Sequence, residues 1–125
     1  MEIKRIDCDF SVCKLADYTQ VDLDAEYCFI GKTEEEKSCV CITQKVPSNV
    51  ILQDDGWKAF RIQGVLDFSL VRILSKISGI LAENRIGIFA ISTYNTDYVL
   101  TRNADYEKAL QVLSEAGYTI LQDME

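Results

Sequence analysis

The fold is decided by residues 70–81, which read Leu70-Val71-Arg72-Ile73-Leu74-Ser75-Lys76-Ile77-Ser78-Gly79-Ile80-Leu81. Apolar residues recur in this stretch three and four positions apart, which places them on one face of a helix. Asp67 stands at the N-cap position, and Asn84 stands where a left-handed residue would end the helix. The spacing therefore predicts a helix over 68–83 with one buried face.

A second helix is predicted over residues 104–116. Asn103 precedes this segment as an N-cap, and Gly117 ends it. Its apolar residues also have the helical spacing, and they form the stripe Tyr106, Ala109, Leu110 and Leu113.

Four segments around these helices have the composition of β-strands: residues 57–63, 86–93, 98–102 and 118–121. Residues 86–91 are apolar on both faces, which predicts a strand in the middle of a sheet. The turn-forming residues 94–97 join the second and third strands in a hairpin. The order is therefore β-α-β-β-α-β, an α+β, ferredoxin-like arrangement in which an antiparallel sheet carries both helices on one face.

The first 56 residues resemble a shortened copy of the same unit. Phe29–Thr33 matches Phe89–Thr93 at a spacing of 60, and Cys39–Cys41 falls on Val99–Thr101 at the same spacing. The segments between are too polar for long amphipathic helices, so this half is expected to be mostly β, with strands near 3–7, 10–15, 27–32 and 38–43. We expect two parts, a truncated unit over 1–56 and a complete unit over 57–125, packed as one body.

The charge balance excludes several classes of function. The chain has 125 residues, with 13 basic residues against 20 acidic ones and no histidine. An acidic chain is a poor ligand for nucleic acid, and the absence of histidine removes the commonest general base and metal ligand. No apolar run is long enough to span a membrane or to form a signal core, so we expect a cytoplasmic protein without membrane contact.

Five cysteines lie in the first third of the chain. Their odd number and the missing secretion signal indicate a reducing compartment. Cys39 and Cys41 share one face of a strand, a spacing that would suit a soft-metal or redox pair, but free cysteine also behaves as a small buried hydrophobe. We interpret the cysteines as packing residues, and we expect no metal and no cofactor.

Residues 61–68 run from a strand through Gly64 into a helix N-terminus, a geometry that suits an anion. The segment Gln63-Gly64-Val65 resembles the phosphate loop of acylphosphatases. That family carries an arginine in the loop, where this chain has Asp67 and Phe68, and a carboxylate there would repel phosphate. We therefore expect no enzymatic activity.

A broader resemblance covers the whole second half. It rests on four segments in the correct order and spacing: Gly64–Phe68, Ile77–Asn84, Ile86–Phe89 and Ser92–Leu100. Together they resemble an ACT domain of the type found in aspartate kinases and CASTOR-type arginine sensors. The resemblance extends more faintly through Phe29–Thr33, and it indicates a small stand-alone protein of bacterial type.

The ACT resemblance implies regulatory binding of a small ligand, usually an amino acid, between paired ACT units. The matching positions in the loop and the neighbouring strand are Gly64, Val65, Leu66, Asp67, Ile88 and Phe89. A hairpin stretch of CASTOR-type sensors that contacts the arginine side chain is similar to Thr93, Tyr94, Asn95 and Asp97. Each of these residues also has a purely structural explanation as a turn, cap or packing residue.

Two classes of function remain open on the sequence. The first is an amino-acid sensor whose ligand changes its association with itself or with a regulated protein partner. The second is an interaction module that keeps the ACT fold without a ligand. Asp97 has no Lys or Arg close to it in the sequence, so we expect a basic amino acid as ligand. A β-α-β-β-α-β sheet leaves edge strands open, and the resemblance implies pairing of ACT units, so we expect a homo-oligomer as the assembly.

Overall fold

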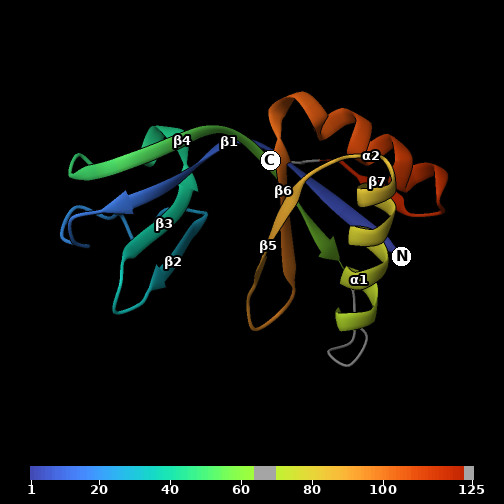
Figure 1. Ribbon diagram of the computed structural model, residues 1–125. Helices are drawn as coiled ribbons and strands as arrows, with labels where there is room; N and C mark the ends of the chain where they lie inside the picture. The colour runs from blue at the N-terminus through green and yellow to red at the C-terminus, as the bar shows by residue number, and fades with distance from the viewer. Residues whose placement is uncertain (64–69, 123–125) are drawn as a thin grey trace. The chain divides into compact units, whose positions relative to one another are not determined.

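A computed structural model describes residues 1–63 and 70–122 (Figure 1). The chain forms two compact units. Unit 1 contains Met1–Asp7 and Lys58–Glu125, and unit 2 contains Cys8–Trp57. The division of the sequence at residues 56 and 57 stays a prediction.

Seven strands and two α-helices make up the described part of the chain. The strands are β1 (Glu2–Leu15), β2 (Cys28–Lys32), β3 (Lys37–Ile42), β4 (Val50–Gln63), β5 (Ile88–Ser92), β6 (Asp97–Arg102) and β7 (Thr119–Leu121). The helices are α1 (Leu70–Glu83) and α2 (Tyr106–Glu115), and each of the short 3₁₀ turns η1 (Thr43–Lys45) and η3 (Asn103–Asp105) follows a hairpin. The hydrogen-bonded strand order is β2-β3-β1-β4-β6-β5, with β7 beside β1. The predicted α+β class with an antiparallel, ferredoxin-like sheet is confirmed.

Unit 1 packs α1 and α2 against its strands, and Figure 1 shows both helices on one side of them. The apolar faces predicted from the spacing form its core: Ile77 and Leu81 of α1 are fully buried, as are Ala109 and Leu113 of α2. The start of β1 also belongs to this unit, because Ile3 pairs with Ile120 of β7 in a parallel register. The strand order thus places β1 between β7 and β4, a neighbour that the pattern within 57–121 could not reveal.

The prediction that residues 86–91 form a central strand is wrong. β5 stands at the end of the strand order, with β6 as its one neighbour among the described strands. Its side chains Ile88, Phe89 and Ile91 are half-buried, Ala90 is exposed, and Ile88 packs against the core of unit 1. The position of a strand in the sheet depends on pairings with distant segments, which its own apolar pattern does not record.

The helix ends differ from the predictions in detail. Arg85, and not Asn84, has the left-handed backbone after α1 (φ 61°), while the Asn84 side-chain amide donates to the Ile80 carbonyl at 2.9 Å. Asn103 begins η3 and does not cap α2. Gly117, with φ 106°, ends α2 as predicted. The predicted cap Asp67 lies outside the described residues.

Unit 2 is built from strands and turns. β3 pairs in antiparallel register with both β1 and β2. The strands predicted near 3–7 and 10–15 are one continuous strand. Cys13, Cys39 and Cys41 are buried beside Leu15, which agrees with their interpretation as packing residues. All of residues 8–57 are described, and they contain no α-helix.

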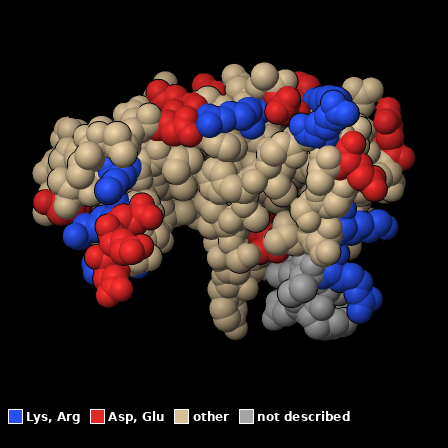
Figure 2. Space-filling view, viewed as in Figure 1, with Lys and Arg blue, Asp and Glu red and all other residues tan. Residues whose placement is uncertain are grey.

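The spacing of 60 relates the two hairpins residue by residue. Cys28 pairs with Cys41 in the first hairpin, and Ile88 pairs with Thr101 in the second. The turns also match, because the amide of Thr33 donates to the Glu36 carbonyl at 2.9 Å and the amide of Thr93 donates to the Thr96 carbonyl at 2.9 Å. Their surfaces differ: Figure 2 shows charged side chains gathered on the β2–β3 hairpin and none at the tip of the β5–β6 hairpin.

Candidate functional site

The strongest match to the predicted ligand site is a groove in unit 1. Its volume is about 300 Å³, and it lies between the end of β4 and the β5–β6 hairpin. The described residues that line it are Arg61, Ile62, Gln63, Thr93, Asn95, Thr96 and Tyr98. The two elements are joined directly, because the Thr96 hydroxyl donates to the Ile62 carbonyl at 2.6 Å.

The four hairpin residues of the predicted site differ in whether they line this groove. Thr93 and Asn95 line the groove. Tyr94, at the tip of the turn, is 95% exposed and is not part of the groove lining. The structure therefore brings two of the four predicted hairpin residues to the end of β4.

Asp97 has a different environment from the one that its place after a turn indicates. It is the first residue of β6, pairs with Ser92, and is only 5% exposed. Its neighbours Thr96 and Tyr98 line the groove, whereas Asp97 does not. Alternation along the strand explains this arrangement, since successive side chains point to opposite faces of a sheet.

The remaining predicted residues do not meet at this groove. Ile88 and Phe89 are half-buried in β5 and are not among its lining residues. Gly64, Val65, Leu66 and Asp67 lie outside the described residues. The strand that leads into them, β4, forms one wall of the groove.

Arg61 is the functional candidate that the sequence reasoning missed. It is half-buried, and its Nε donates to the Gln63 side-chain oxygen at 2.8 Å. Strand alternation provides a signal for it, because Phe60 and Ile62 are buried while Arg61 and Gln63 face the other way. A guanidinium beside amide and hydroxyl groups can hold a carboxylate by paired hydrogen bonds.

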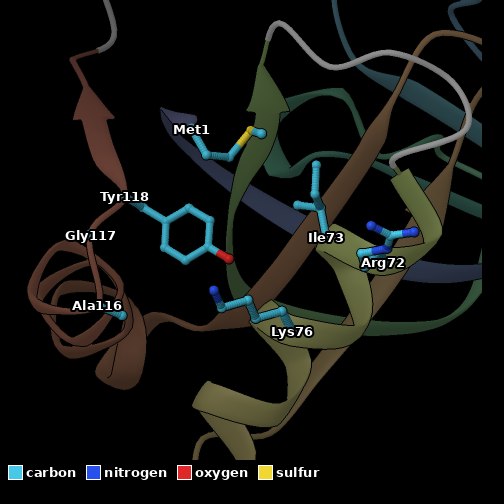
Figure 3. A pocket seen from close by; sticks show the side chains of 7 residues that line it. All are labelled: Met1, Arg72, Ile73, Lys76, Ala116, Gly117 and Tyr118. Atoms are coloured by element: carbon cyan, nitrogen blue, oxygen red, sulfur yellow. The ribbon is translucent and has the colours of Figure 1, made fainter.

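A second cavity of unit 1, also about 300 Å³, lies between the helices. One wall is α1, which contributes Arg72, Ile73 and Lys76; the other comes from the end of α2 and the residues after it, with Met1 beside them (Figure 3). Tyr118 is 8% exposed, and Figure 3 shows its hydroxyl on the side that faces Lys76. Burial raises the pKa of this hydroxyl, which keeps it protonated at neutral pH. No pattern in the sequence indicated this cavity.

Other chemistry is sparse in the described residues. None of their acidic and cysteine side chains forms a group of three or more that could hold a metal ion. No described helix has the length and apolarity to cross a membrane. Burial raises the pKa of the Cys13 thiol to about 11, so this cysteine stays a neutral packing residue.

Comparisons with protein-family models and with solved structures give the following similarities. A family model of the ACT domain matches residues 53–115. A structurally characterised protein from Agobacterium tumefaciens is 30% identical to this chain, with a TM-score of 0.86; the match covers 99% of this chain and 94% of that protein. No curated protein sequence matches this chain.

Two more distant structures share the fold. A Vibrio cholerae protein of unknown function, described as a possible transport protein, is 19% identical, with a TM-score of 0.65 and coverage of 91% of this chain and 88% of that one. An allosteric aspartate kinase from Clostridium acetobutylicum is 12% identical, with a TM-score of 0.64. That match covers 91% of this chain but only 33% of the kinase.

Proposed function

Because this chain belongs to the ACT domain family, we propose that it is a regulatory protein that binds an amino acid and does not itself catalyse a reaction. ACT domains are regulatory domains, and the structural similarity includes an allosteric aspartate kinase. The proposed binding site is the groove beside β4 and the β5–β6 hairpin.

The observation that supports this site most directly is the convergence of Arg61, Thr93 and Asn95 on one groove. The guanidinium of Arg61 offers paired donors for the carboxylate that every free amino acid carries. The hydroxyl of Thr93 and the amide of Asn95 add neutral hydrogen-bonding groups on the opposite wall. Residues 64–67, which follow β4 directly, remain predicted contributors to the same site.

The nature of the ligand side chain is a separate step of the proposal. Asp97 lies between two groove residues in the sequence, and its buried carboxylate makes the potential nearby more negative. We therefore retain the preference for a basic amino acid, with Asp97 acting through the field at the groove. A charge-assisted interaction of this kind contributes on the order of 1.5–3 kcal/mol at contact and less at longer range.

The proposed output is a change in association. β5 pairs only with β6 among the described strands, which leaves its other edge able to pair with a second copy of the chain. Ligand binding next to this hairpin would then favour or weaken the association with that copy or with a regulated partner protein. Sedimentation at tens of micromolar, with and without ligand, tests this part; a monomer under both conditions contradicts it.

The site is tested by a thermal-shift screen of the twenty amino acids. A ligand at 100 times its Kd stabilises the folded state by about 2.7 kcal/mol, which moves the melting temperature of a domain of this size by several degrees. Arg61→Gln should abolish the response, whereas Lys108→Gln, at an exposed position on α2, should preserve it. Asp97→Asn should weaken binding of arginine or lysine about tenfold if the charge argument holds.

The outcomes separate the steps of the proposal. If no amino acid stabilises the protein, the ligand-binding function is wrong and the interaction module is the better description. If an amino acid binds Arg61→Gln as tightly as the original chain, the ligand site lies elsewhere. If Asp97→Asn binds basic amino acids unchanged, or if only apolar amino acids bind, Asp97 is simply a structural residue of β6.

A further inference from the structure

The cavity between α1 and the end of α2 has the charge of an anion site. Arg72 and Lys76 lie one helical turn apart on α1, and both line the cavity. Neither forms an ion pair with a described residue, and no acidic residue is among the described residues that line the cavity. The described lining of this small cavity therefore carries two positive charges and no negative one, in a chain of net charge −7.

Tyr118 supplies the second, independent feature. Its side chain is more than nine-tenths buried, lines the cavity, and has no hydrogen bond from its hydroxyl to any described residue. Figure 3 shows the hydroxyl turned toward the space in front of Lys76. Among the described residues, Asn49 Oδ1 is the one enclosed side-chain polar atom without a partner, so the Tyr118 hydroxyl reaches the open space of the cavity and is free to donate there. A ligand atom that accepts a hydrogen bond at this point would use this donor.

The rest of the described lining is apolar. Met1, Ile73 and Ala116 contribute side chains to its walls, together with the ring of Tyr118. Small-molecule sites typically combine a mostly apolar lining with a few placed polar groups, and a volume of about 300 Å³ is at the small end of their range.

We propose that this cavity is a second ligand site, which binds a small organic anion: a carboxylate or phosphate group held by Lys76, Arg72 and the Tyr118 hydroxyl, on a compact apolar body packed against Ile73. The cavity and the groove at the end of β4 share no described residue, so the two sites can be occupied independently.

The proposal is tested with four probes that share a ring and differ in charge: benzoate, phenyl phosphate, benzyl alcohol and benzylamine. Binding to the full chain is followed by amide shifts in two-dimensional NMR. We expect one or both anions to shift the amides of Ile73, Ala116, Gly117 and Tyr118, with no comparable shifts from the neutral or cationic probe. Comparing benzoate with phenyl phosphate distinguishes the two anionic groups.

Two variants and one control locate the site. Lys76→Gln and Tyr118→Phe should each weaken binding of the anion about threefold or more, since each removes one donor from a partly exposed site. Lys108→Gln removes the same charge from an exposed position on α2 outside the cavity and should leave the affinity unchanged. Lys76 is exposed, so its replacement tests the site without a loss of folding.

Three results would overturn the proposal. The first is equal shifts from the anionic and neutral probes, which would indicate apolar binding without charge recognition. The second is unchanged affinity in both Lys76→Gln and Tyr118→Phe. The third is the absence of amide shifts around the cavity with any anion at millimolar concentration. The groove variant Arg61→Gln should leave binding of these probes intact, so failure of this site and failure of the amino-acid site are separable.

Discussion

The β2–β3 and β5–β6 hairpins have the same register and the same turn, yet they support different structures. Both are followed by a 3₁₀ turn at a spacing of 60, η1 and η3. After η3 the chain continues into α2, while after η1 it reaches Pro47 and a single turn closed by the Val50 amide and the Pro47 carbonyl. The same hairpin therefore occurs with and without a following α-helix, and the larger hydrophobic core lies in the unit that contains the helices.

The position after each 3₁₀ turn shows this contrast most clearly. Tyr106 begins α2 and is 1% exposed; its hydroxyl donates to the Ala59 carbonyl at 2.6 Å and accepts from the Ile6 amide at 3.1 Å. Val46, sixty residues earlier, is only half-buried, and it packs against the buried cluster of unit 2 that contains Cys13, Cys39 and Cys41. One residue thus links three segments of unit 1, whereas its counterpart only packs.

The largest expected effect comes from these two positions. Tyr106→Phe leaves a buried amide and a buried carbonyl without their partner, and we expect a loss of about 2–4 kcal/mol in the free energy of unfolding. Val46→Ala should lose about 1 kcal/mol, because its methyl groups are only partly buried. Urea unfolding followed by circular dichroism measures both values. A smaller loss for Tyr106→Phe than for Val46→Ala would contradict the comparison.

An effect of intermediate size on the free energy of unfolding is expected when the pH is lowered. In unit 2, a hydrogen bond from Ser11 lowers the pKa of the Asp55 carboxyl, and hydrogen bonds from Thr19 lower the pKa of the Asp17 carboxyl. A lowered pKa means that the folded state binds protons less readily than the unfolded state, so stability is present above the ordinary value and is lost as the pH falls below about 4.

The two units provide separate signals for this acid effect. Trp57 is the single tryptophan and belongs to unit 2, while both described α-helices belong to unit 1. On acidification the fluorescence of Trp57 should change before the helical circular dichroism is lost. A double variant with Asp17→Asn and Asp55→Asn should weaken this dependence on pH. Loss of the helical signal first, or an unchanged profile in the double variant, would argue against the assignment.

The smallest effect is expected where the repeats are most alike. Cys39 and Val99 occupy equivalent positions in β3 and β6 and are both buried. Cys39→Val is a near-isosteric change that should alter the free energy of unfolding by less than about 1 kcal/mol and should leave any amino-acid response intact. Thermal unfolding with and without ligand measures both. A loss of ligand response would show that the thiols do more than pack.

Local patterns in the sequence determined much of this fold. The spacing of Ile77 and Leu81 placed them on the buried face of α1, Gly117 marked the end of α2, and the repeat of 60 residues matched the hairpins in register. These features depend on residues within a few turns or one hairpin of each other. Periodicity and turn chemistry act over that range, and the sequence displays them directly.

Only the tertiary structure decided the features that join distant segments. β5 ends the strand order and Ile3 pairs with Ile120, because sheet position depends on pairings that no local pattern records. The same applies to the sites: Arg61 meets Asn95 in the groove, and Lys76 meets Tyr118 in the cavity, only after strands and helices have packed. The sequence supplied the side chains, and long-range packing determined which of them share a site.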